Sequence, residues 1–113
     1  MAAMAATPKT QKLVRDLIPS IILATGKRPQ VRQLSDDEYR AALRAKAQEE
    51  LDELTEAKAD EIIGELADLY EVLRAISVHE GIGWAAVEEA ANAKRAARGA
   101  FAERIWLESV SDP

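Results

Sequence analysis

The sequence predicts an all-α protein that folds as an antiparallel helical bundle. Apolar residues make up 48% of the 113 residues and aromatic residues only 4%. Alanine is frequent, and this composition favours packed helices over sheets. Apolar side chains also recur at helical spacing in two neighbouring segments, 36–57 and 61–79, joined by a link of a few residues. Two helices with so short a connection are expected to pack as antiparallel neighbours.

The chain is predicted to contain a flexible N-terminal tail over residues 1–11 and a single helical domain over residues 12–113. A short helix is expected from about Asp16, with Pro19 tolerated in its first turn and Gly26 as its stop. Residues 30–34 alternate polar and apolar side chains. Together with residues 104–108 they form a candidate two-strand β element beside the bundle.

The helix over 36–57 carries a start signal. Ser35 is followed three residues later by Glu38, which is the spacing of a capping box. Along this helix, Leu43, Leu51 and Leu54 belong to one apolar stripe, and Glu50 falls inside that stripe. The helix over 61–79 has its own apolar face, with Glu65 within it and Asp68 at its margin. A third helix is expected over 84–98.

Charge and cysteine content narrow the possible functions. The net charge of −5 argues against nucleic acid as the main partner, since phosphate contacts need clustered Lys and Arg. Cysteine is absent, which excludes disulfides, thiolate metal sites and cysteine nucleophiles. No apolar stretch approaches the length of a membrane span, and the opening residues lack the basic region of a secretory signal. The sequence therefore predicts a cytoplasmic protein without a membrane partner.

Two acidic pairs are the strongest functional signal. Glu50 and Glu53 on the first helix, and Glu65 and Asp68 on the second, each have i,i+3 spacing and project from one face. Antiparallel packing would gather all four carboxylates, and hard divalent cations such as Mg²⁺ or Mn²⁺ prefer such oxygen ligands. The alternative is an ion-pair network.

Two cations of the third helix are the partners of that alternative network. Lys94 and Arg98 are predicted to face inward beside Val87 and Ala91, whereas Asn92 projects away from this stripe. In such a position the two cations could pair with the acidic cluster, or hold the phosphate oxygens of a metal–phosphate complex.

The acidic pairs resemble the signature of the all-α nucleotide pyrophosphohydrolases, which include MazG-type enzymes, dimeric dUTPases and phosphoribosyl-ATP pyrophosphohydrolase. Two flanking segments resemble the small stand-alone MazG-related branch. They are Lys12-Leu13-Val14-Arg15-Asp16-x-Ile18-Pro19 and Lys94-Arg95-x-x-Arg98-Gly99-x-Phe101-x-x-Arg104-Ile105. The resemblance therefore covers nearly everything after residue 11.

This resemblance implies a Mg²⁺-dependent enzyme that cleaves a nucleoside triphosphate between its α- and β-phosphates, in a house-cleaning role. Mn²⁺ is a possible substitute. It also implies a homodimer or higher homo-oligomer in which a second subunit completes the cleft. The implied metal ligands are Glu50, Glu53, Glu65 and Asp68. The implied catalytic residues are Glu49, which would orient or deprotonate the attacking water, and Glu50. The implied substrate contacts are Lys94, Arg98, Asn92, Lys12, Arg15 and Arg104.

Two functions other than catalysis stay open for this sequence. The chain could be a helical interaction module, with the acidic cluster serving only as an ion-pair network. It could also bind nucleotides or a metal as a sensor without turnover. A metal-dependent rise in melting temperature would argue against the first, and formation of product would argue against both.

Overall fold

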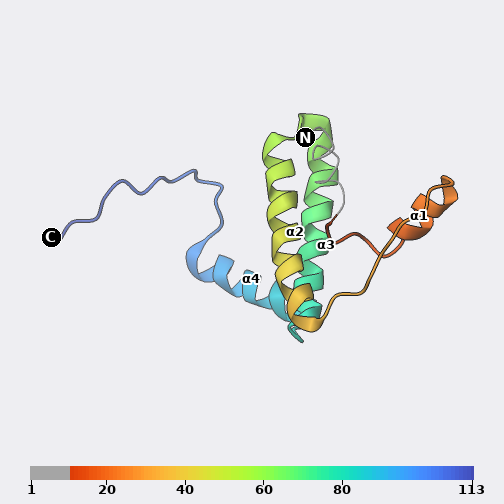
Figure 1. Ribbon diagram of the computed structural model, residues 1–113. Coiled ribbons are helices and arrows are strands. Elements are labelled where there is room, and N and C mark those ends of the chain that lie inside the picture. Colours follow the sequence, from red (N-terminus) through yellow and green to blue (C-terminus); the bar gives the residue numbers. More distant parts are fainter. Residues whose placement is uncertain (1–10) are drawn as a thin grey trace.

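The computed structural model describes residues 11–113, and the prediction of an all-α fold is confirmed. Two long antiparallel helices form a hairpin, and shorter helices extend from it (Figure 1). In chain order the helices are α1 (Ile18–Ala24), α2 (Asp36–Glu56), the short 3₁₀ helix η2 (Ala59–Glu61), α3 (Ile62–His79) and α4 (Trp84–Arg98). Each α-helix begins and ends within about two residues of its predicted bounds.

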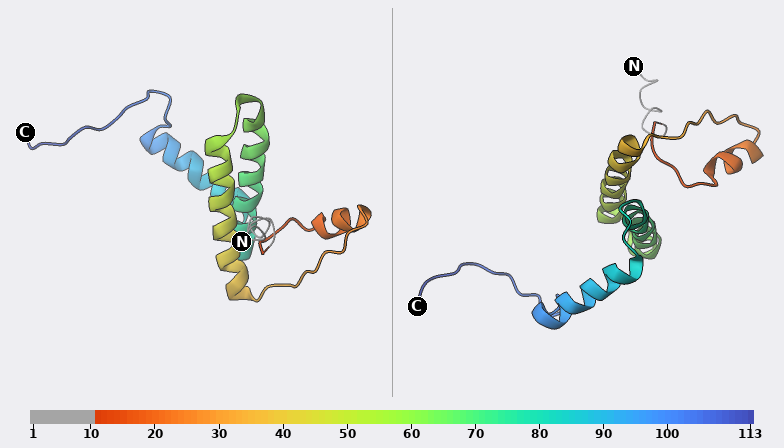
Figure 2. Two further views of the ribbon diagram at one scale, coloured as in Figure 1. Left: turned by 45° about the horizontal axis from the view of Figure 1, so that its top comes forward. Right: turned by 90° about the horizontal axis from the view of Figure 1, so that it is seen from below.

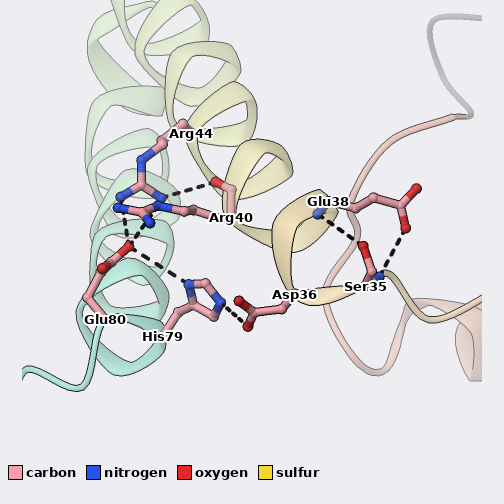
Figure 3. Close-up of polar contacts among 7 residues, drawn as sticks. All are labelled: Ser35, Asp36, Glu38, Arg40, Arg44, His79 and Glu80. Carbon is pink, nitrogen blue, oxygen red and sulfur yellow. Dashed lines mark hydrogen bonds and ion pairs between the residues drawn. The ribbon is translucent and has the colours of Figure 1, made fainter.

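The capping box at the start of α2 is confirmed. The Ser35 hydroxyl accepts a hydrogen bond from the Glu38 backbone N–H at 3.3 Å, and the Glu38 carboxylate accepts one from the Ser35 N–H at 3.0 Å (Figure 3). Arg32 adds a two-pronged hydrogen bond to the same carboxylate, with distances of 3.1 and 2.9 Å. The cap thus satisfies two backbone donors that the helix itself leaves unpaired.

This cap predicts a defined acid sensitivity. The hydrogen bond from Arg32, followed by the one from the Ser35 backbone, lowers the pKa of Glu38 from 4.5 to about 2. A carboxyl group whose pKa falls on folding adds stability above its unfolded value, and that stability is lost as the pH falls through the folded value. We therefore expect Glu38→Gln to lose less melting temperature than the wild type between pH 6 and pH 3. Circular dichroism melts at both pH values measure the difference, and equal losses in the two proteins would contradict it.

The turn between α2 and α3 is tight. Ala57 leaves the helix in an extended conformation, and the backbone N–H of Lys58, just before η2, donates to the Glu61 carboxylate at 2.8 Å. The hairpin core is small, because Leu43 and Val72 are the only buried apolar residues among those described. Leu51, on the predicted apolar stripe, remains 44% exposed.

The other end of the hairpin is joined by charged groups (Figure 3). His79 Nε2 lies 2.8 Å from the Asp36 carboxylate, and the Tyr39 ring packs edge-on against the imidazole. The Glu80 carboxylate pairs with Arg40 at 3.2 Å and with Arg44 at 3.1 Å. These contacts connect the first turns of α2 to the end of α3 and so fix how the two helices align.

Outside the hairpin, the chain is open. No other helix of residues 11–113 packs against α1, and α4 contacts only α3. The two views of Figure 2 show α1 and α4 extending away from the hairpin in different directions. The radius of gyration is 19.0 Å, against about 13 Å for a compact domain of this length. The hairpin alone therefore leaves much apolar surface uncovered.

The candidate β element is wrong. Residues 11–113 contain no strand, and the residues of both proposed segments are exposed except Leu34, which is half-buried. Helix α4 carries residues 104–108 away from the hairpin, whereas residues 30–34 lie beyond its other side (Figure 2). Alternating side chains alone do not hold a strand that has no partner for its backbone.

The predicted flexible tail, residues 1–11, lies outside the described residues except for its last position. Across residues 11–113, every helix is too short or too polar to cross a bilayer.

Candidate metal centre

The hairpin brings the two acidic pairs together. Antiparallel packing of α2 and α3 sets the pair from each helix at the same level of the hairpin. Carboxylate oxygens of Glu50, Glu65 and Asp68 all lie within 4.8 Å of one another. Oxygens of Glu49, Glu50 and Glu53 form a second such group, so that Glu50 belongs to both. The sequence-predicted ligands are therefore neighbours in space.

Glu50 is the most buried member of this acidic cluster. Only 6% of its surface is exposed, and its Oε1 atom is buried without a hydrogen-bond partner. Burial, followed by the neighbouring Glu53 carboxyl group, raises the pKa of Glu50, although the positive charge of Lys46 acts in the opposite direction. A buried carboxylate oxygen with no partner is expensive. Glu65 has a second such atom, Oε2.

Three cations lie against the cluster. Lys46 Nζ is 3.0 Å from Glu49 Oε2 and 3.5 Å from Glu50 Oε2. Arg15 donates to Asp68 Oδ1 at 2.8 Å, and Lys12 Nζ lies 4.0 Å from Glu49 Oε2. The N-terminal segment before α1 thus places both of its predicted substrate-binding residues beside the carboxylates.

Lys46 was not among the sequence-predicted site residues. Burial lowers its pKa, but the hydrogen bond to Glu49 and the charges of Glu49 and Glu50 outweigh burial, and the pKa of Lys46 is raised. Its side chain is 15% exposed. The signal for this contact was in the sequence, since Lys46 precedes Glu49 by three residues and Glu50 by four, the spacings at which helical side chains meet.

The residues present fit a divalent cation. The donors are all carboxylates, which suit Mg²⁺ and Mn²⁺. Two of their oxygens, Glu50 Oε1 and Glu65 Oε2, are buried and have no protein partner. Such atoms in a folded protein call for a ligand or for an explanation. Within residues 11–113, the surrounding cations pair with Oε2 of Glu50 and Oδ1 of Asp68 and leave these two oxygens free.

The basic residues predicted on the third helix do not lie beside the acidic cluster. The prediction that Lys94 and Arg98 face inward is wrong for the single chain, because α4 has no buried residue and both side chains are exposed. Asn92 is exposed, as its projection predicted, and accepts a hydrogen bond from Arg95 at 2.8 Å. Arg104 lies beyond α4 in the exposed C-terminal segment. The inward prediction failed because it assumed that α4 folds back onto the hairpin.

An open apolar hollow of about 510 Å³ lies on α3 and the start of α4. The Tyr70 and Trp84 rings meet edge to face at 5.5 Å, and the Arg74 guanidinium lies over both rings. The lining residues are Ile63, Leu66, Ala67, Leu69, Tyr70, Leu73 and Trp84. Several are largely exposed, Ile63 at 81% and Leu66 at 51%. Exposed apolar patches are common at interaction sites.

Comparison with known proteins agrees with this geometry. The family model for phosphoribosyl-ATP pyrophosphohydrolase matches residues 14–95, which include the whole acidic hairpin. An uncharacterized protein of Mycolicibacterium smegmatis is 59% identical over 46 residues, 41% of this chain and 47% of the relative, so the match spans about half of that relative's length. No solved structure matches the chain. The chain belongs to the phosphoribosyl-ATP pyrophosphohydrolase family, within the MazG-like all-helical nucleotide pyrophosphohydrolases.

Proposed function

We propose that this protein hydrolyses a nucleoside triphosphate between its α- and β-phosphates, giving a nucleoside monophosphate and pyrophosphate. Family membership implies a pyrophosphohydrolase. The observation that carries the finer proposal is the convergence of the two acidic pairs around two buried, unpaired carboxylate oxygens, Glu50 Oε1 and Glu65 Oε2. The role we propose is removal of unwanted nucleotides from the cellular pool.

Glu50, Glu53, Glu65 and Asp68 would hold Mg²⁺, or Mn²⁺ in its place. A bound divalent ion neutralises phosphate charge and lowers the pKa of a bound water. Glu49 is suited to a different task, because its Oε2 atom already accepts a hydrogen bond from Lys46. Glu49 would orient the attacking water and accept its proton.

Lys12 and Arg15 would bind the substrate rather than stabilise the fold. Both are long, partly exposed cations at the edge of the cluster. Their contacts to Glu49 and Asp68 are exposed ion pairs, which contribute little stability. The two side chains are therefore free to exchange a carboxylate for a phosphate oxygen when substrate binds, and Arg is well suited to bidentate phosphate contacts.

We also propose that the working unit is a homodimer. The apolar hollow on α3 and α4 is open, and α4 holds Lys94 and Arg98 on an exposed surface away from the cluster of the same chain. A second copy packed on the hollow would bury this surface and could bring the cations of its α4 to the substrate. Asn92 and Arg104 would approach in the same way. A site of this kind is incomplete in one chain.

The identity of the products tests the reaction. A panel of ribo- and deoxynucleoside triphosphates is incubated with the protein and Mg²⁺, and the products are separated by anion-exchange chromatography. We expect monophosphate and pyrophosphate from at least one nucleotide, and at least about a hundredfold less from Asp68→Asn. Glu56→Gln, on an exposed position of the same hairpin, is the matched control and should keep full activity.

Other outcomes of this assay would contradict the proposed reaction. Diphosphate with inorganic phosphate would mean that the wrong bond is broken. A complete absence of product would favour the ion-pair reading, in which Lys46 and Arg15 are the permanent partners of the carboxylates.

A further inference from the structure

Lys46 contacts two adjacent carboxylates at different distances. Its Nζ atom is hydrogen-bonded to Glu49 Oε2 at 3.0 Å and lies 3.5 Å from Glu50 Oε2. The lysine side chain is 15% exposed and that of Glu50 only 7%. An ammonium group held in such a place is fixed in position, unlike the exposed lysines that extend into water.

This contact gives the two glutamates different surroundings. Glu50 has Oε2 toward Lys46 and leaves Oε1 buried without a partner. Glu49 has its Oε2 atom near two cations, Lys46 and Lys12. Glu49 thus faces two positive charges, whereas Glu50 is within reach of only one and keeps a second oxygen, Oε1, without a partner. Glu50 also belongs to both groups of converging carboxylates, and Glu49 only to the group with Glu50 and Glu53.

We propose that Lys46 is a positioning residue: it holds the Oε2 atom of Glu49 in place and competes with a divalent cation for the Oε2 atom of Glu50. The catalytic part of this inference rests on the proposed hydrolysis, while the metal-binding part does not. Lys46 gives the cluster a permanent positive charge, so the hairpin can fold before a divalent ion arrives.

The charge of Lys46 then has two opposite effects. An ammonium group beside a cation site repels the incoming ion and competes for its ligands, and this effect is strong at short range in a partly buried place. Lys46 therefore weakens metal binding. At the same time it fixes the carboxylate that would act on water. Removal of Lys46 should tighten metal binding and slow the reaction, a combination that a merely structural residue would not give.

The experiment uses the full chain and four variants. Lys46→Met removes the charge and keeps the length, Lys46→Gln removes the charge but can still form a hydrogen bond, and Lys46→Arg keeps the charge. Lys27→Met, at an exposed position before α2, is the matched control. Mn²⁺ is titrated without nucleotide by isothermal calorimetry, and melting temperatures are measured with and without Mg²⁺.

Lys46→Met should bind Mn²⁺ at least about threefold more tightly than the wild type. Its metal-free melting temperature should fall, since breaking a buried pair is destabilising, and saturating Mg²⁺ should restore most of that loss. With a nucleotide that the wild type hydrolyses, kcat should fall at least about tenfold while KM changes less than about threefold. Lys46→Arg should recover most of kcat, and Lys27→Met should match the wild type throughout.

Unchanged or weaker Mn²⁺ binding in Lys46→Met overturns the inference, as does a loss of melting temperature that Mg²⁺ leaves unaltered. If Lys46→Met does not fold without metal, the same comparison is made with Lys46→Gln. Failure of the proposed function looks different: no variant and no wild-type protein forms product, yet Mn²⁺ binds more tightly when Lys46 is neutralised.

Discussion

Glu50→Gln is expected to stop hydrolysis and, at the same time, to make the metal-free protein more stable. Glu50 is 6% exposed, has an unpaired buried oxygen and has a raised pKa that results chiefly from its burial. An amide of the same shape removes the buried charge. Activity should fall at least about a hundredfold. The melting temperature without metal should rise by about 5 °C, which corresponds to removal of about 1 kcal/mol of the cost of an unsatisfied buried group.

The gain in stability should depend on pH in a specific direction. The pKa of Glu50 is higher in the folded chain than its ordinary value, so the folded state binds more protons than the unfolded state between the two values. Stability of the wild type therefore falls as the pH rises through this interval, and the cost is fully present only above the pKa of the folded state. Below about pH 4 the advantage of Glu50→Gln should disappear.

Melting curves at pH 7.5 and at pH 4, with and without Mg²⁺, measure these effects. Mg²⁺ should raise the melting temperature of the wild type and have little effect on Glu50→Gln, because the variant lacks a ligand. The control is again Glu56→Gln, which removes one negative charge from the same helix at an exposed position. If the variant keeps its activity, Glu50 is not an essential metal ligand. If the variant is less stable than the wild type at pH 7.5, the buried charge of Glu50 does not destabilise the metal-free protein.

Ile63→Lys is expected to separate the proposed dimer into monomers and to reduce activity at least about tenfold. Ile63 lines the apolar hollow yet is 81% exposed in the single chain, so the change costs the hairpin little. In a dimer that covers the hollow, a buried ammonium group without a partner would be strongly unfavourable. Sedimentation velocity measures the oligomeric state, and calorimetry measures Mn²⁺ binding.

Mn²⁺ binding should survive in Ile63→Lys, because the predicted ligands all lie on one hairpin. Val31→Lys is the control, since Val31 is 64% exposed and lies outside the hollow. A dimer that persists in Ile63→Lys would place the interface elsewhere. A monomer with full activity would remove the need for a second subunit at the site.

The parts of the fold that depend on local spacing could be predicted from the sequence. The capping box of Ser35 and Glu38 and the bounds of α2, α3 and α4 follow from contacts within a few residues. The anomalous position of Glu50 was also visible, because a charge inside an apolar stripe is seldom left unpaired. The proximity of the two acidic pairs then followed from the short link between their helices.

Features set by the path of the chain could not be predicted. The sequence does not reveal that the segment before α1 lies beside the hairpin, and so the contacts of Lys12 and Arg15 were expected only from resemblance. The direction of α4 depends on one turn around Gly81, Ile82 and Gly83. With α4 directed away from the hairpin, residues 104–108 lose the neighbour that a strand needs, and Lys94 loses its apolar surroundings.

The open hairpin also determines the order in which the protein can fold. Its stabilising contacts join α2 to α3, which are neighbours along the chain, and local contacts of this kind form quickly. Helices α1 and α4 gain no comparable partner among residues 11–113. Refolding from denaturant should therefore begin with a fast phase that is independent of protein concentration, as the hairpin closes. A slower phase should follow whose rate rises with concentration, because in the proposed dimer the hollow on α3 is covered only when two chains meet.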